Sequence, residues 1–189
     1  MNKTKLALSL VIALAVAPAV QASPVELVSN GGFETGNFTS WTRSGNLGFT
    51  GVNNQAHTGS FAAIMGPIGS DGFLTQTLST VIGKLYNITF WLAHDGGTPN
   101  DFGVTFGGNT VFSQFNAGGS GYTMITLANV AASSVNDALV FNFRQDPAYY
   151  HLDDVSVTAA VPIPAALPLL LAGLGGLGFV GRKSRKKST

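Results

Sequence analysis

The stretch LVFNFR, residues 139–144, places large apolar side chains at every second position. In an extended chain Leu139, Phe141 and Phe143 lie on one side, and Asn142 and Arg144 lie on the other. This pattern is typical of a β-strand with one face in a core and the other toward solvent. A second stretch, LYNITFWLA at 85–93, is apolar on both sides, which predicts a central strand of a sheet.

Similar short apolar runs recur about every ten residues from Pro24 to Thr158, separated by Gly, Asn, Asp and Ser. The expected strands are 25–28, 47–52, 61–65, 73–78, 85–93, 102–106, 110–115, 122–127, 138–144 and 149–158. No part of this region has the period of an amphipathic helix. The sequence therefore predicts an all-β domain at 23–159, folded as a two-sheet jelly-roll sandwich.

The charges are segregated along the chain. All nine acidic residues lie between positions 26 and 154, where the basic residues are Arg43, Lys84 and Arg144, which leaves this region a net charge of −6. Binding to phosphate backbones needs clustered Lys and Arg, so the composition excludes a nucleic-acid partner. The chain has no cysteine, which excludes disulfides, thiolate metal sites and cysteine nucleophiles.

The first residues, MNKTKLALSLVIALAVAPAVQAS, have the pattern of a signal peptide. Lys3 and Lys5 precede an apolar run too short to span a bilayer comfortably, and residues 20–22 offer the small side chains that a signal peptidase needs. We expect residues 1–22 to be removed by cleavage after Ala22, with Ala19 as the alternative. An uncleaved membrane anchor is the other interpretation.

The last residues form a second apolar segment. Residues 161–181 carry no charge, and five basic residues follow between positions 182 and 187. A run of about 20 apolar residues can cross a bilayer as a helix, and basic residues beyond it stay cytoplasmic. We predict a C-terminal tail at 160–189, with a proline motif, a transmembrane helix at 165–181 and a basic cluster. Together with a signal peptide, this topology places the β domain outside the cytoplasm.

This tail resembles the PEP-CTERM sorting tail in its VPLPA-type variant. The motif residues that carry the resemblance are Val161, Pro162, Pro164, Arg182 and Lys183. Ile163 stands where the commonest form has glutamate. The resemblance implies recognition by exosortase, a membrane transpeptidase-like protease. It also implies export through the inner membrane of a Gram-negative bacterium, anchoring in transit, and delivery to the outer surface or extracellular matrix with exopolysaccharide. A plain C-terminal anchor is the alternative.

Residues for catalysis are scarce. His57, His94 and His151 lack the spacing of a metal motif, and His94–Asp95 has the composition of a polar turn. The GGFETG stretch at 31–36 has no P-loop lysine. We therefore expect no catalytic residues and a protein that is not an enzyme.

The β domain resembles the galactose-binding-like jelly roll shared by many carbohydrate-binding modules. The segments that carry this resemblance are 30–34, Trp41, 57–60, 90–91 and 152–155. The resemblance implies that the first and last strands lie side by side, which would bring Glu34 and Asp153 together.

A structural calcium ion is expected at this junction, because calcium prefers carboxylate and carbonyl oxygens. If Asp153 shares the core-facing side of its strand with Val155 and Val157, it is an inward carboxylate that needs a cation. The expected calcium ligands are Glu34, Asp153, Gly32 and Ser60. In the alternative, Asp153 caps a turn through backbone amides.

Sugar binding uses exposed aromatic rings beside planar polar groups. The aromatic residues available for it are Phe115, Tyr122, Tyr149, Tyr150 and Trp91. The expected ligand contacts are Trp91, Tyr149 and Tyr150. The two adjacent tyrosines point to opposite faces, so only one of them can lie in the core. Trp41 is expected to pack in the interior.

Three functions remain open. The first is a non-enzymatic envelope or matrix protein associated with exopolysaccharide or biofilm. The second is a dedicated carbohydrate-binding module, and the third is a small glycan-active hydrolase or lyase on the same scaffold. An aromatic cluster on one face would favour the second, and two converging titratable groups would favour the third.

Overall fold

A computed structural model describes residues 23–161. The expected signal peptide and nearly all of the sorting tail, including Pro162, Pro164, Arg182 and Lys183, lie outside the described residues. Within them the chain forms ten strands: β1 (Thr42–Gly45), β2 (Thr50–Asn53), β3 (Ala62–Met65), β4 (Gly72–Ser79), β5 (Leu85–His94), β6 (Asn100–Phe106), β7 (Asn109–Phe115), β8 (Ser120–Ala131), β9 (Asn136–Gln145) and β10 (Tyr150–Ala159). Residues 23–161 contain no helix of the length and hydropathy needed to span a membrane.

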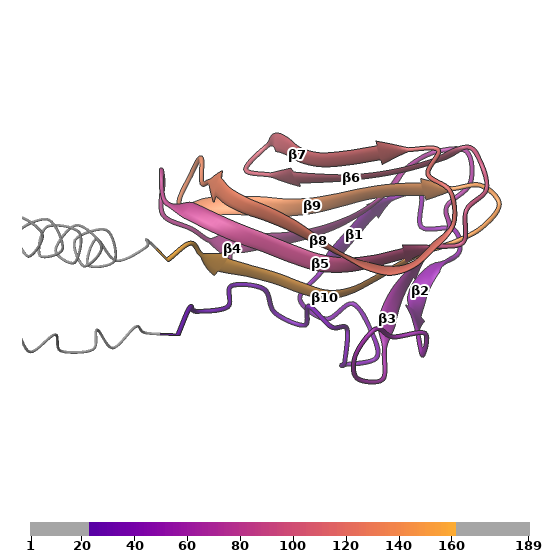
Figure 1. Ribbon diagram of the computed structural model, residues 1–189, viewed down its shortest axis with the longest axis horizontal. Coiled ribbons are helices and arrows are strands. Elements are labelled where there is room, and N and C mark those ends of the chain that lie inside the picture. The colour runs from indigo at the N-terminus through magenta and orange to yellow at the C-terminus, as the bar shows by residue number, and fades with distance from the viewer. Residues whose placement is uncertain (1–22, 162–189) are drawn as a thin grey trace, which may run out of the picture.

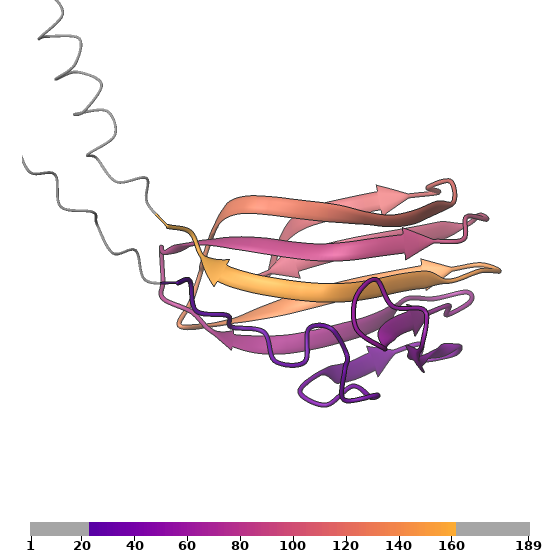
Figure 2. The ribbon, with the colours of Figure 1, turned by 60° about the horizontal axis from the view of Figure 1, so that its bottom comes forward.

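The strands form two antiparallel five-stranded sheets that pack face to face (Figure 1). One sheet has the order β1-β4-β9-β6-β7 and is called the β9 sheet below. The other has the order β2-β3-β10-β5-β8 and is called the β10 sheet. Figure 2 shows the same two layers from below, with β10 in front. The all-β jelly-roll prediction is confirmed.

The core lies between the sheets and is rich in aromatic rings. Phe90 of β5 packs within 5.4 Å of Phe141 of β9, measured between ring centroids, and Phe102 of β6 lies 5.9 Å from Phe141. The alternation seen in LVFNFR is retained, because Phe141 and Phe143 are completely buried while Asn142 and Arg144 reach the outer face. β5 pairs with both β8 and β10, as its two apolar sides predicted. Trp41 is buried, as expected.

The N-terminal segment departs from the expected pattern. Residues 25–28 form no strand, only an isolated bridge between Glu26 and Thr158 of β10. The Glu26 carboxylate accepts the backbone N–H groups of Val28 and Val157, both at 2.8 Å, so a side chain replaces part of a β-ladder. Conversely, β1 was not expected, because its sequence TRSG is exposed throughout and shows no apolar alternation.

β10 contains a bulge that changes which face its acidic residues occupy. Asp153 pairs with Trp91 and Ser156 pairs with Thr89, so two residues of β10 oppose one of β5. Val155 points into the core, whereas Asp153 lies on the outer face. The expectation that Asp153 shares the core-facing side with Val155 is wrong, because the extra residue reverses the alternation at this point.

Candidate functional site

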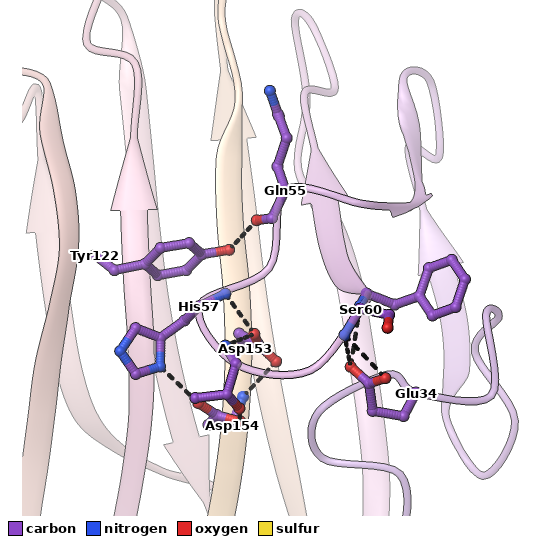
Figure 3. A network of polar contacts seen from close by, with 9 residues as sticks. Glu34, Gln55, His57, Ser60, Tyr122, Asp153 and Asp154 are labelled. Atoms are coloured by element: carbon purple, nitrogen blue, oxygen red, sulfur yellow. Dashed lines mark hydrogen bonds and ion pairs between the residues drawn. The ribbon is translucent and has the colours of Figure 1, made fainter.

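The β2–β3 loop, residues 54–61, crosses the outer face of the β10 sheet and is held by two carboxylates (Figure 3). Asp153 is completely buried beneath it, and its Oδ2 accepts the backbone N–H groups of His57 at 2.8 Å and Thr58 at 3.2 Å. Glu34 Oε1 accepts the N–H groups of Ser60 at 2.9 Å and Phe61 at 3.0 Å. The two acids therefore fix successive parts of one loop.

A third carboxylate joins this group. Asp154 Oδ2 lies 2.7 Å from His57 Nδ1, and its Oδ1 accepts the Thr58 hydroxyl at 2.6 Å. A Cβ atom on Gly32 would lie 3.6 Å from Oδ1 of both Asp153 and Asp154. Burial raises the pKa of Asp153, and hydrogen bonds from the N–H groups of Asp154, His57 and Thr58 oppose that rise.

These contacts bear on the expected calcium ligands. Ser60 presents its N–H to Glu34, and Gly32 lies beside the carboxylates of Asp153 and Asp154. The cap described above, in which backbone amides satisfy Asp153, is present. Among residues 23–161 no three His, Asp or Glu side chains are placed to share a metal ion. A calcium ion at this loop would therefore need main-chain carbonyl ligands in addition to the acids.

Trp91 supports the same loop from below. Its indole lies on the outer face of β5, and the His57 ring stacks on it with ring centroids 3.7 Å apart and planes 16° apart. Tyr122 of β8 meets His57 edge-on at 5.4 Å and donates its hydroxyl to the carbonyl of Gln55 at 2.7 Å. Burial and the nearby Asp153 raise the pKa of Tyr122, which keeps this hydroxyl a donor. One ring face of Trp91 is thus covered by the protein itself.

The two tyrosines at the start of β10 are separated by the sheet. Tyr150 is completely buried and donates its hydroxyl to Asn100 Oδ1 at 2.7 Å, so it offers no surface to a ligand, which corrects the expectation for this residue. Burial raises the pKa of Tyr150 to about 12. Tyr149 is half-buried, and its ring packs so closely over Gly66 that a side chain there would overlap it.

The opposite side of the sandwich carries a different surface. On the outer face of the β9 sheet, Asp101 pairs with both Arg144 and Phe115, and Asn142 pairs with Phe73. Phe115 is 72% exposed. The surface formed by Phe73, Asp101, Phe115, Asn142 and Arg144 is called the β9 face below.

Hydrogen bonds hold the polar side chains of the β9 face in place. Asn142 donates its Nδ2 to Asp101 Oδ1 at 3.3 Å, and Arg144 binds Asp146 Oδ2 through Nε at 3.0 Å and Nη2 at 2.6 Å. Gly103 pairs with Asn142 between them, and a side chain at Gly103 would collide with the Asn142 amide. The Asn142 amide therefore occupies the space over Gly103 of β6.

The electrostatics of the β9 face are acidic. Burial raises the pKa of Asp101 above its ordinary value, and the negative charge of Asp71 adds to the rise, while Arg144 opposes it. Arg144 is the basic residue of the face and is already paired with Asp146. Such a surface disfavours anionic ligands and suits neutral ligands with hydroxyl groups.

Sequence reasoning found part of this surface. The alternation in LVFNFR places Asn142 and Arg144 on the solvent side, and Phe115 was among the available aromatic residues. Asp101 and Phe73 were missed, because no local pattern sets them apart. They join the others only through the register of β6 and β4 against β9.

No family model matches the chain, and no curated protein matches it in sequence. Solved structures match its fold. TmCBM61, solved in complex with β-1,4-galactotriose, is 21% identical with a TM-score of 0.60, and the match covers 72% of this chain and 99% of that chain. The CBM22-1 xylan-binding domain from Paenibacillus barcinonensis Xyn10C is 18% identical with a TM-score of 0.55, covering 76% of this chain and 100% of that one.

A third match has a different description. The K1 cleaved adhesin domain of Lys-gingipain from Porphyromonas gingivalis is 16% identical with a TM-score of 0.55, and the match covers 74% of this chain and 100% of that domain. At these identities the likeness shows the fold alone. The fold is the jelly-roll sandwich that carbohydrate-binding modules also have.

Proposed function

We propose that this protein is a non-enzymatic glycan-binding protein and that the β9 face binds the glycan. The observation that carries the proposal is the exposed Phe115 opposite Asp101, which accepts a hydrogen bond from the Asn142 amide and pairs across the strands with Arg144. Likeness in fold to carbohydrate-binding modules supports the same function.

The chemistry of the β9 face fits a sugar ring. Aromatic rings such as Phe115 pack against the apolar C–H side of a pyranose, while planar side chains such as Asn142 and Asp101 pair with its hydroxyl groups. A uronic acid residue would meet Asp71, Asp101 and Asp146, which repel its carboxylate. The proposed ligand class is therefore a neutral polysaccharide.

Affinity electrophoresis of the chain in gels containing neutral or acidic polysaccharides tests the proposal. We expect retardation in at least one neutral polysaccharide, with β-1,4-galactan and xylan among those tried, and none in alginate. Phe115→Ala and Asn142→Ala should each weaken binding about tenfold, since each removes about 1.4 kcal/mol of contact energy. Phe49→Ala removes a ring of similar exposure, 64% against 72% for Phe115, outside the β9 face and serves as the matched control.

The outcomes separate the alternatives. Binding lost in Trp91→Ala but kept in Phe115→Ala would move the site to the β10 sheet. Shortening of the polysaccharide during the assay would favour a hydrolase or lyase, with Asp101 as the first residue to test because its raised pKa suits a general acid. Retardation in none of the polysaccharides overturns the proposal.

We also propose the cellular context that the two ends of the sequence predict. A signal peptide at 1–22 exports the chain, and the tail at 160–189 passes it to exosortase, which leaves the β domain on the outer surface or in the extracellular matrix, near exopolysaccharide. The negative charge of the domain and the neutral-ligand chemistry of the β9 face are compatible with that setting. A structural calcium ion at Glu34 and Asp153 belongs to the same proposal, supported by the two carboxylates that hold successive parts of the β2–β3 loop.

A further inference from the structure

One end of the sandwich carries a group of exposed apolar side chains. They come from the N-terminal segment, the β4–β5 loop with the start of β5, the β8–β9 loop and the segment after β10. The members of this apolar rim are Val25, Val81, Ile82, Leu85, Val135 and Val161. Large apolar side chains gathered at one end of a domain mark an interaction site more often than isolated ones do.

Backbone hydrogen bonds hold the rim together. Thr80 donates its N–H to the carbonyl of Val135 at 3.0 Å, which joins the β4–β5 loop to the β8–β9 loop. Ala160 donates to the carbonyl of Leu85 at 2.8 Å, which joins the chain leaving β10 to the start of β5. A cavity of about 390 Å³ between the N-terminal segment, the β4–β5 loop and the end of β10 is lined by Val25, Val81 and Val161 among others.

The rim lies at the end where the described chain both begins and ends. Figures 1 and 2 show the indigo start and the yellow end of the coloured chain at the same end of the sandwich, and residues of both line the cavity with Val81 and Lys84 of the β4–β5 loop. The predicted transmembrane helix starts at 165, six residues after β10 ends at Ala159. Six residues span at most about 21 Å, so a bilayer that holds this helix lies close to the rim.

Most acidic residues of the domain lie away from the apolar rim. Asp71, Asp95, Asp101 and Asp146 lie at the opposite end of the sandwich, near the starts of β4, β6 and β10 and the ends of β5 and β9. Toward the rim, the Asp137 carboxylate is buried and bound by Ser133 and Ser134.

Glu26, next to Val25, is exposed, and its carboxylate accepts the backbone N–H groups of Val28 and Val157, while Lys84 brings an exposed ammonium to the rim. Acidic lipid headgroups would thus meet apolar side chains, one cation and one hydrogen-bonded carboxylate, and most of the acidic residues would point away.

We propose that the apolar rim lies against the surface of the phospholipid bilayer that holds the C-terminal helix. The occupant of the rim is the boundary between lipid headgroups and acyl chains, into which residues such as Ile82 insert. The inference rests on the topology proposed for the tail and is independent of glycan binding. It gives the anchored protein a fixed orientation, with the end that carries the acidic residues directed away from the membrane.

The chain has no cysteine, so single labels can be placed cleanly. Ile82→Cys, at a site 67% exposed, carries a polarity-sensitive dye on the full chain after removal of the signal peptide. The labelled protein is reconstituted in vesicles of phosphatidylethanolamine and phosphatidylglycerol that contain an acyl-chain quencher. Ile68→Cys, at a site 52% exposed on the β3–β4 loop at the opposite end, is the matched control.

We expect quenching at position 82 to exceed that at position 68 about twofold or more, because only the first label reaches the acyl boundary. A label at Val135→Cys, 64% exposed on the neighbouring loop, should be quenched as strongly as the label at position 82. This second site shows that the result does not come from a local distortion caused by the label at position 82. Equal, weak quenching at positions 68, 82 and 135 in protein that floats with the vesicles overturns the rim proposal alone. Protein that does not float with the vesicles overturns the tail topology and the rim together. If the dye at position 82 reports an apolar environment only at a high ratio of protein to lipid, the rim contacts a second copy of the chain. That result overturns the proposal that the rim contacts lipid.

Discussion

A completely buried carboxylate, that of Asp153, is stabilised by backbone N–H groups of residues 57, 58 and 154. Burying an unpaired charge is very costly, so these amides decide whether the residue is tolerated. Asp154 adopts a positive φ of 48°, which is part of the bulge where its N–H meets Oδ1 of Asp153 at 2.7 Å. Asp153 therefore joins β10 to a loop nearly a hundred residues earlier in the chain, and its function here is to position that loop.

Two buried histidines predict how stability depends on pH. Burial lowers the pKa of both His94 and His151, although the nearby Asp95 opposes this for each of them. Below the ordinary histidine pKa of about 6.5 the unfolded chain then binds more protons than the folded one, so stability falls as pH falls. We expect the melting temperature to drop between about pH 7 and pH 5, and the drop to be smaller by about 2–4 °C in His151→Gln.

Two acids with a raised pKa have the opposite effect on how stability depends on pH. Asp101 and Asp153 favour the folded state as pH falls toward their own pKa values, which partly offsets the histidines. The comparison of His151→Gln with the native chain removes this contribution, because both proteins share it. If the melting temperatures of the two proteins fall by the same amount from pH 7 to pH 5, the assignment of the drop to His151 is wrong.

At the scale of strands and loops, the sequence predicted what depends on local alternation. β9 follows from apolar side chains at every second position, β5 from apolar residues on both of its sides, and β4 from a short apolar run bounded by turn residues. β1 was missed because its four residues are polar and exposed, and it exists only by pairing with β4. The bulge at Asp153 could not be seen either, because nothing in HLDDVSV distinguishes a regular strand from one with an inserted residue.

The β2–β3 loop also shows why the candidate sites were only partly predictable. Glu34, His57, Ser60 and Asp153 were all identified from short motifs, and the structure brings all four to this loop. The motifs do not state whether Ser60 presents its N–H or its carbonyl to Glu34. That depends on the path of the loop, which in turn depends on the stack of His57 on Trp91.

Thermal melts with calcium and with a chelator test the metal proposed at this loop. A ligand that binds only the folded state stabilises it by mass action, by about 2.7 kcal/mol at a hundredfold excess over its Kd. We expect a higher melting temperature in calcium, and Asp153→Ala should abolish the difference. Asp154→Ala, which removes a neighbouring carboxylate whose side chain is 28% exposed, serves as the control for loss of charge.

The alternative, in which Asp153 only caps the loop, gives a different pattern. Asp153→Ala would then leave the N–H groups of His57 and Thr58 without acceptors and cost about 2–4 kcal/mol in calcium and in chelator alike. Melting temperatures that do not differ between calcium and chelator in the native chain rule out the metal site.

At the scale of the whole molecule, the sandwich separates three surfaces. The β9 face lies on one sheet, the loop held by Glu34 and Asp153 lies on the other, and the apolar rim lies at the end where the chain enters and leaves. A membrane at the rim leaves the β9 face free, because that face lies along the side of the sandwich and its charged residues are toward the far end. The proposed anchoring and the proposed glycan binding are therefore compatible while the tail is attached.

The proposed sorting by exosortase requires a release from the membrane, and the proline motif predicts where the chain would be cut. Pro162 and Pro164 favour an extended linker, a conformation that a protease can bind, between the end of β10 and the apolar run. Intact-mass analysis of protein taken from the cell surface or matrix should show a chain that starts near Ser23 and lacks the residues beyond about Pro164.

The control for this prediction is Pro162→Ala with Pro164→Ala, which keeps the apolar run and the basic cluster but alters the motif. If exosortase reads the motif, this variant should stay in the membrane at full mass, while its β domain still folds because the described contacts of β10 end before Pro162. With a plain anchor the native chain would behave as the variant does, and both would stay in the membrane at full mass. Native protein in the matrix that still carries the basic cluster Arg182–Lys187 would show that the tail is not a sorting signal of this kind.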